Sequence, residues 1–195
     1  MTAPTGMANA MLVTYPDLFA AGQVVGALPY GAARDALSAL SVMKSGSRRS
    51  RQEWGDLARA ASGEGESVLP AVSIWQGRAD RVVSPLNAEA ALSQWLDLHG
   101  LDEDAGERET GPQCTSLIWR DADGKTLVEY RLLEGLDHGL PVIACHASQK
   151  RQPYMLEGAI GAPQQFYETF IRQRVVAARG QSISSPRSKR RSGRS

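Results

Sequence analysis

Cysteine is scarce in this chain, which contains only Cys114 and Cys145 among its 195 residues. Two cysteines at that spacing match neither a zinc cage nor a redox motif. The sequence therefore predicts no metal and no other cofactor. A single disulfide between the two cysteines remains open at this stage.

Long apolar runs and internal repeats are also missing from the sequence. A helix that crosses a bilayer needs about 20 predominantly apolar residues, so we expect no membrane span. Residues 1–5 lack the positive start and apolar stretch of a secretory signal. As written, the chain is expected to stay in the cytoplasm, where it is made.

The composition predicts one folded domain followed by a basic tail. Hydrophobic residues make up 42% of the chain, enough for a substantial core over residues 1–180. Residues 181–195 hold five basic side chains and no acid, whereas the rest of the chain is mildly acidic. Because the tail has no aromatic residue and no apolar face, we interpret it as a disordered end and expect no nucleic-acid partner.

An acidic residue follows a short buried strand near the middle of the chain. Residues 71–75 are apolar, β-branched or aromatic apart from one serine, and they lead to Gly77. This pattern is typical of a buried parallel strand. Asp80 comes next, in a loop that Val82 and Val83 pin to the core.

A histidine follows a second strand of the same kind. Residues 128–133 form a second strand-like run that is closed by Gly135, and His138 lies between Gly135 and Gly139. In an open parallel sheet the loops after the strands share one edge, so Asp80 and His138 can meet there. We therefore expect an α/β fold with an acid and a histidine at one edge of its sheet.

A carboxylate beside a histidine favours nucleophilic hydrolysis. The acid orients the imidazole ring and stabilises the imidazolium that forms when a hydroxyl group loses its proton. The order acid, then histidine, is that of the α/β-hydrolases, in which a serine on a G-x-S-x-G turn comes first. The chain contains no such turn.

Other residues compete for these roles. Asp137 is the rival acid, although a sequence neighbour rarely points at the same ring. His99 and His146 are interpreted as structural or solvent-facing residues. Cys145 and His146 do not form a dyad by adjacency alone, because successive side chains of an extended backbone point apart.

The remaining pattern alternates helices with short strands. Helices are expected over residues 7–14, 32–44, 54–61, 85–100 and 163–179. Strands are expected over residues 23–28, 115–119 and 126–133, with a hairpin turn at residues 121–124. We expect a charged loop over residues 102–111 and a polar loop over residues 147–153. The helix at 54–61 is expected to cover the active-site edge, as part of a lid or substrate wall.

Five phrases of the sequence resemble the poly(3-hydroxybutyrate) depolymerase-type esterases, a branch of the α/β-hydrolases. They are T-Y-P-D-L-F at 14–19, A-L-P-Y-G at 27–31, V-S-I-W-Q-G-R-A-D at 72–80, W-R-D-A-D-G at 119–124 and G-L-D-H-G at 135–139. They occur in the family's order, from about residue 7 to residue 171. The resemblance implies an α/β-hydrolase fold, a carboxylic-ester hydrolase, Asp80 as the catalytic acid and His138 as the base.

The resemblance further implies a hydroxyalkanoate polymer or oligomer, or a short-chain or aryl ester, as substrate, and an extracellular location for the family. The cysteine that the family carries after Y-G is replaced here by Ala32, which puts its usual disulfide in doubt.

The resemblance also shows what is missing. Counting back from Thr14 places the nucleophile near Thr2, where the chain has T-A-P-T and Pro4 replaces a glycine of the turn. We therefore expect the C-terminal part of an α/β-hydrolase domain, truncated in its N-terminal half and inactive as written. The alternative is a non-catalytic remnant or binding protein. A third idea, an N-terminal Thr2 nucleophile, needs a threonine built into a pocket.

Overall fold

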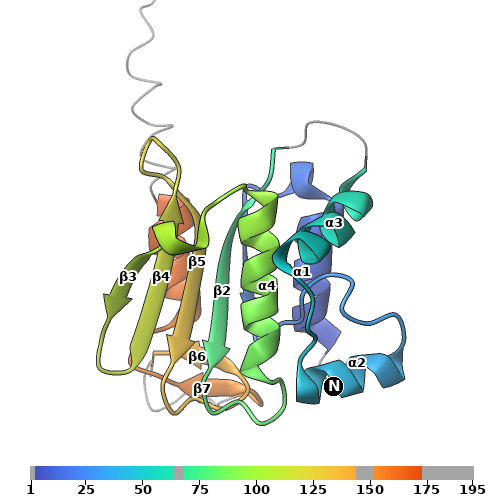
Figure 1. The fold of residues 1–195 in the computed structure, drawn as a ribbon. Coiled ribbons are helices and arrows are strands. Elements are labelled where there is room, and N and C mark those ends of the chain that lie inside the picture. The colour runs from blue at the N-terminus through green and yellow to red at the C-terminus, as the bar shows by residue number, and fades with distance from the viewer. Residues whose placement is uncertain (1–2, 64–67, 144–151, 173–195) are drawn as a thin grey trace, which may run out of the picture.

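A five-stranded sheet forms the centre of the computed structural model, which describes residues 3–63, 68–143 and 152–172 (Figure 1). Its strand order is β1-β2-β5-β4-β3. The strands are β1 (Ala21–Val25), β2 (Ala71–Gly77), β3 (Glu107–Thr110), β4 (Cys114–Arg120) and β5 (Thr126–Leu133). Strands β1, β2 and β5 are parallel, and β4 and β3 add antiparallel strands beyond them.

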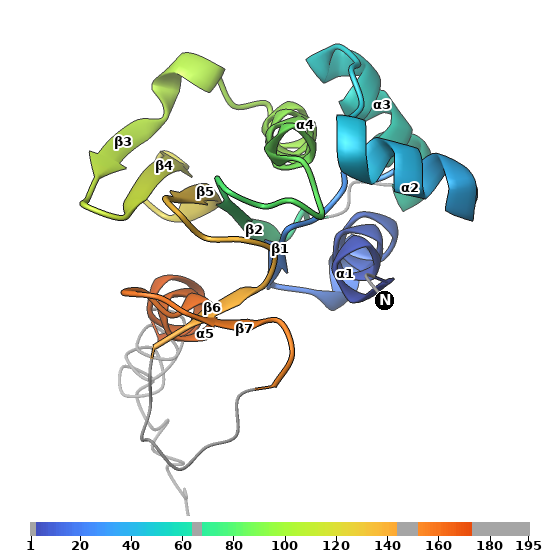
Figure 2. The same ribbon diagram turned by 90° about the horizontal axis from the view of Figure 1, so that it is seen from below.

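Helices cover both faces of this sheet (Figure 2). The helices α1 (Ala3–Thr14), α2 (Ala36–Ser45), α3 (Arg51–Ser62) and α4 (Pro85–Leu98) precede β3 in the chain. The main core joins α4 to β2 and β5, with Trp95, Ile74 and Val128 fully buried. On the opposite face lie β6 (Leu140–Val142), β7 (Met155–Glu157), α5 (Ala162–Phe166) and the π-helical turn η3 (Tyr167–Arg172). The α/β class is thus confirmed.

Most expected elements are present, with shifted ends. Strand β1 ends before Gly26, whose φ of 58° takes the chain out of the strand. Helix α2 begins only at Ala36, because the side chain of Asp35 accepts a hydrogen bond from the Ser38 N–H and so caps the helix. The hairpin between β4 and β5 turns at Gly124, as expected.

The charged segment 102–111 is not wholly a loop, which corrects our expectation. It contains the short 3-10 helix η2 (Glu103–Ala105) and the edge strand β3. All four residues of β3 are exposed, so the strand carries no apolar alternation that would reveal it. Charged side chains on an exposed edge also discourage pairing with other molecules.

The position expected for α3 is wrong. This helix packs against α4 and α1, and Arg51 donates a hydrogen bond of 2.9 Å to the Leu96 carbonyl near the end of α4. The loops that follow β2 and β5 lie at the opposite end of the sheet (Figure 1). Trp54 and Ala58 bury the apolar face of α3 in the core, so this face cannot line a substrate wall.

Part of our expectation lies outside the described residues. The last helix, expected over 163–179, begins at Ala162 and is described as far as Arg172. The polar loop over 147–153 is described only at its last two residues. A further 3-10 turn, η1 (Pro16–Leu18), follows α1. Among the described residues, no helix is long and apolar enough to cross a membrane.

Candidate active site

Asp80 lies in a tight loop immediately after β2. Its Oδ1 accepts hydrogen bonds from the backbone N–H groups of Val82 and Val83, both at 2.8 Å. Its Oδ2 accepts a hydrogen bond of 3.1 Å from Gln76 Nε2 and lies 2.9 Å from His138 Nδ1. The residue is only 8% exposed. Four donors thus surround the carboxylate and hold it in one orientation.

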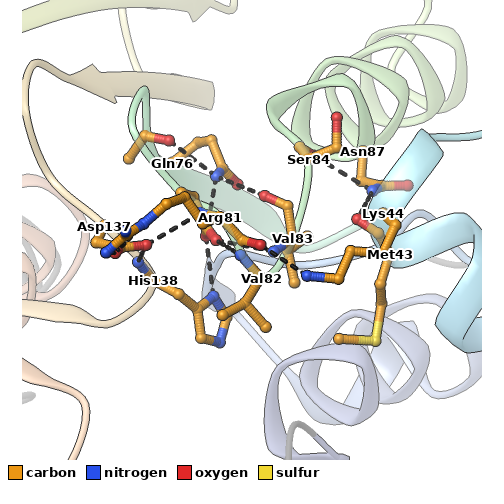
Figure 3. Close-up of polar contacts among 12 residues, drawn as sticks. Met43, Lys44, Gln76, Arg81, Val82, Val83, Ser84, Asn87, Asp137 and His138 are labelled. Carbon is orange, nitrogen blue, oxygen red and sulfur yellow. Dashed lines mark hydrogen bonds and ion pairs between the residues drawn. The ribbon is translucent and has the colours of Figure 1, made fainter.

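His138 extends from the loop after β5 toward this carboxylate (Figure 3). The 2.9 Å contact confirms that the two strand ends bring the acid and the imidazole together. An ionised carboxylate can only accept, so a neutral imidazole in this position carries its proton on Nδ1 and has its lone pair on Nε2. Tyr154 packs edge-on against the ring at 5.9 Å between centroids. The ring is therefore oriented for Nε2 to accept a proton.

Two glycines allow the backbone to approach this pair. A Cβ atom at Gly77, the last residue of β2, would collide with the Leu136 carbonyl of the histidine loop. A Cβ atom at Gly26, just after β1, would lie 3.1 Å from the ring of His138. Only a residue without a side chain lets the two loops and the end of β1 come this close.

Asp137 does not contact the imidazole ring. Its carboxylate accepts a hydrogen bond of 2.8 Å from the His138 backbone N–H and forms an ion pair of 2.6 Å with Arg81 Nη2. The Arg81 N–H and guanidinium, together with the His138 N–H, hold the pKa of Asp137 far below its usual value. The geometry therefore leaves Asp80 as the acid that faces the ring.

The C-terminal end of α2, rather than α3, lies beside the Asp80 loop. Lys44 Nζ donates a hydrogen bond of 2.8 Å to the Arg81 carbonyl (Figure 3). The Ser84 N–H donates one of 2.7 Å to the Met43 carbonyl. These contacts brace the loop from the side opposite to His138.

The remaining candidates lie away from the pair or outside the described residues. His99, after the last turn of α4, approaches the Pro70 carbonyl at 3.2 Å through Nε2, and burial lowers its pKa. Cys114 is a free cysteine that is buried in the sheet. Thr2, Cys145 and His146 lie outside the described residues. No group of three potential metal ligands occurs among the residues that the structure describes.

Gln76 is a site residue that sequence reasoning missed. It is fully buried at the end of β2, and its Nε2 donates to the carbonyls of Gly77 and Val83 as well as to Asp80. The available signal was a long polar side chain in an otherwise apolar strand, since a buried polar group requires a partner.

Comparison with known proteins gives a consistent answer. A family model described as Esterase PHB depolymerase matches residues 1–116. The chain belongs to this esterase family. Poly(3-hydroxyalkanoate) depolymerase C of Paucimonas lemoignei is 32% identical over 142 residues, which are 73% of this chain and 34% of that protein. An acetylxylan esterase of Coprinopsis cinerea is 34% identical over 143 residues, or 69% of this chain and 37% of that protein.

Solved structures agree with this assignment to the esterase family. An acetyl xylan esterase from Aspergillus awamori superposes with a TM-score of 0.60 at 25% identity, covering 69% of this chain and 50% of that one. The α/β-hydrolase fold that the resemblance implied is thus confirmed. The chain spans about a third of the length of the two curated relatives named above. Asp80 lies inside the matched residues 1–116, and His138 lies beyond them.

Proposed function

We propose that this chain supplies the acid, Asp80, and the base, His138, of a serine-type carboxylic-ester hydrolase. The observation that carries the proposal is the 2.9 Å contact between Asp80 Oδ2 and His138 Nδ1 at the edge of the sheet. Membership of an esterase family supports the reaction class. The hydrogen bonds to Asp80 support its role, because a fixed carboxylate can orient an imidazole and stabilise the imidazolium.

The proposed reaction is acyl transfer in two steps. A serine hydroxyl attacks the ester carbonyl while His138 Nε2 takes its proton, and the alcohol leaves with that proton as its C–O bond breaks. Water then attacks the acyl-serine, with His138 again accepting a proton, and the carboxylic acid is released as the proton returns to the serine. Asp80 stays ionised throughout and holds Nδ1–H.

The nucleophile is the part of this mechanism that lies outside the described residues. None of their hydroxyl groups forms a hydrogen bond with His138 Nε2. The ring lies over Gly26 at the end of β1, and β1 has only one partner in the described sheet. We therefore propose that the serine reaches Nε2 from a strand-and-turn segment beside β1, and that the sequence as written does not hydrolyse esters alone.

Relatives suggest the substrate class. Their names refer to poly(3-hydroxyalkanoate) and to acetylxylan. We propose an ester of this kind: a hydroxyalkanoate polymer or oligomer, or a short-chain or aryl ester. An extracellular setting is part of the same proposal.

The test compares this chain with a chain extended at its start by a segment that carries a G-x-S-x-G turn. Both are assayed with 4-nitrophenyl acetate under burst conditions and with hydroxybutyrate oligomers. The extended chain should show an acyl-enzyme burst and turnover, and His138→Ala should reduce its rate by about 10⁴-fold or more, because triad members act as a unit. The unextended chain should be no faster than its own His138→Ala variant.

His99→Ala in the extended chain is the matched control, since His99 lies at the other end of α4 and should not affect the chemical step. Turnover by the unextended chain that Thr2→Ala abolishes would replace the proposal with an N-terminal threonine mechanism. Turnover that survives His138→Ala would place the active site elsewhere.

A non-catalytic binding protein is the second candidate. The observation that favours it is the lack of a hydroxyl partner for His138 Nε2 among the described residues. If this candidate is right, the extended chain should bind hydroxybutyrate oligomers in a calorimetric titration and should show no acyl-enzyme burst with 4-nitrophenyl acetate.

A further inference from the structure

The loop after β2 and the loop after β5 are joined by three acid–base contacts that cross from one to the other. Asp80 contacts His138, Arg81 contacts Asp137, and Arg78 contacts Glu134 at 2.7 Å. The Arg81–Asp137 contact joins the sequence neighbour of the acid to the sequence neighbour of the histidine. This contact therefore lies one residue away from each member of the Asp80–His138 pair.

The carboxylate of Asp137 binds the backbone of both loops through one oxygen atom. Its Oδ1 accepts a hydrogen bond of 3.0 Å from the Arg81 N–H and another of 2.8 Å from the His138 N–H. Its Oδ2 receives the Arg81 guanidinium through Nε at 2.9 Å and Nη2 at 2.6 Å (Figure 3). Backbone hydrogen bonds from Arg78 N–H to the Leu133 carbonyl and from Ala79 N–H to the Leu136 carbonyl also join the two segments. Oδ1 of Asp137 adds a link further along, at Arg81 and His138, and the guanidinium orients the Asp137 carboxylate.

The Asp137 carboxylate takes part in two kinds of contact: an exposed ion pair with the Arg81 side chain, and hydrogen bonds to two backbone N–H groups. The Arg81 side chain is 86% exposed, so its ion pair is screened and contributes little stability by itself. The two backbone N–H groups, by contrast, belong to residues whose positions decide where Asp80 and His138 lie. A bond from a charged acceptor to a backbone donor is among the stronger hydrogen bonds in proteins.

We propose that Asp137 is a positioning residue, whose Oδ1 holds the Asp80 loop and the His138 loop in register for catalysis. Arg81 assists by orienting the Asp137 carboxylate. This role in catalysis rests on the proposed function, whereas the geometry of the Asp80–His138 pair can be measured without any turnover. The chain holds three histidines, which makes the imidazole signals of His138 assignable by NMR.

The test follows the Nδ1 proton of His138, which resonates at low field while it is hydrogen-bonded to Asp80. Asp137→Asn removes the charge and the ion pair but keeps Oδ1 as an acceptor, whereas Asp137→Ala removes the acceptor as well. The low-field signal should persist in Asp137→Asn and disappear in Asp137→Ala.

Two controls separate this effect from the loss of an exposed ion pair. Arg81→Ala removes the guanidinium but keeps the backbone N–H, and Glu134→Ala removes the other crossing ion pair. Both variants should keep the low-field signal. Equal signals in Asp137→Ala and Asp137→Asn, whether kept or lost in both, would overturn the proposal.

Amide hydrogen exchange of the unmodified chain provides a test that does not depend on any variant folding. The N–H groups of Arg81 and His138 should exchange at least about tenfold more slowly than in an unstructured peptide. Exchange at unprotected rates would contradict the proposal even if Asp137→Ala fails to fold. Failure of the ester assay alone would leave these results unchanged and would count only against the proposed function.

Discussion

Gln76 shows how a single side chain supports the candidate site at a cost. Its amide nitrogen donates to three oxygen atoms, on Gly77, Asp80 and Val83, which also decides the orientation of the amide. Its Oε1 is buried and has no hydrogen-bond partner in the described part of the chain. An unpaired buried acceptor costs about 1–3 kcal/mol. Such a residue is best explained by the donor that it brings to Asp80.

Replacing this donor tests that explanation. Gln76→Met removes the orphan oxygen but leaves the three acceptors without their shared donor, so we expect a net loss of about 1–3 kcal/mol in the free energy of unfolding. Urea denaturation measures this loss. The low-field proton of His138 should broaden as well, because Asp80 loses one of its four donors.

Gln94→Met is the matched control at this scale. Gln94 is equally buried and bonds to the backbone of Tyr30 and Trp54, away from the Asp80–His138 pair. We expect a similar loss of stability without any change at His138. An unchanged His138 signal in Gln76→Met would show that Gln76 contributes to stability without affecting the Asp80–His138 contact.

Strand β5 carries a buried charged network on the face opposite to α4. Glu129 is fully buried and contacts Arg131 Nη2 at 2.6 Å. Ser73 on β2 donates to Glu129 at 2.6 Å, and the Arg131 guanidinium lies over the Trp75 ring, 5.4 Å from its centroid. Because every charge in the network has a partner, it pins the pairing register of β2 and β5, the two strands that lead to Asp80 and His138.

Breaking one partner of this network should be costly. Glu129→Gln leaves the buried Arg131 charge without its counter-ion, and we expect a loss of about 3–5 kcal/mol in the free energy of unfolding. Chemical denaturation measures it. Glu107→Gln, which breaks an exposed ion pair with Arg120 in the same sheet, should stay within about 1 kcal/mol of the unmodified chain.

The double variant Glu129→Met with Arg131→Met tests whether the loss comes from the unpaired Arg131 charge. It removes both charges, so it should recover part of the loss seen in Glu129→Gln. A small effect of Glu129→Gln would show that water reaches this face of the sheet.

At the scale of the whole molecule, stability should depend on pH through His99. This histidine joins the end of α4 to the segment before β2, through its contact with the Pro70 carbonyl. Burial lowers its pKa in the folded chain, with Lys125 adding to the effect and the Pro70 contact opposing it. On acidification the unfolded chain therefore takes up this proton first.

The sign of the expected effect follows from that lowered pKa. The stability that neutral His99 contributes is fully present above its ordinary pKa of about 6.5 and is lost as the pH falls toward the folded-state pKa. Urea denaturation between pH 7.5 and pH 5 should show this decline, and His99→Gln should weaken it. An equal decline in His99→Gln would assign the pH dependence to other groups.

The sequence alone determined the parallel strands, most helices and the acid–histidine pair. These features depend on local patterns: the apolar run of β2, the strand-like run of β5, the glycines that end them, and the spacing of apolar residues along α4. Asp80 and His138 were found because parallel strands deliver the residues that follow them to one edge. These two residues therefore meet because β2 and β5 are neighbouring parallel strands, and the sequence pattern predicts both strands.

Only the tertiary structure decided which neighbours complete the site. Strand β3 escaped prediction because an exposed edge strand needs no apolar residues, and α3 was misplaced because helical spacing does not say which surface a helix covers. The roles of Gln76 and Asp137 depend on hydrogen bonds to groups of a folded loop. The sequence can show that Gln76 is a polar residue in a buried strand, but it does not say which groups it binds. Such contacts exist only once the chain has brought the end of β2 and the loop after β5 together. Some of them join groups that are distant in sequence. Others depend on the direction in which the local backbone points a side chain.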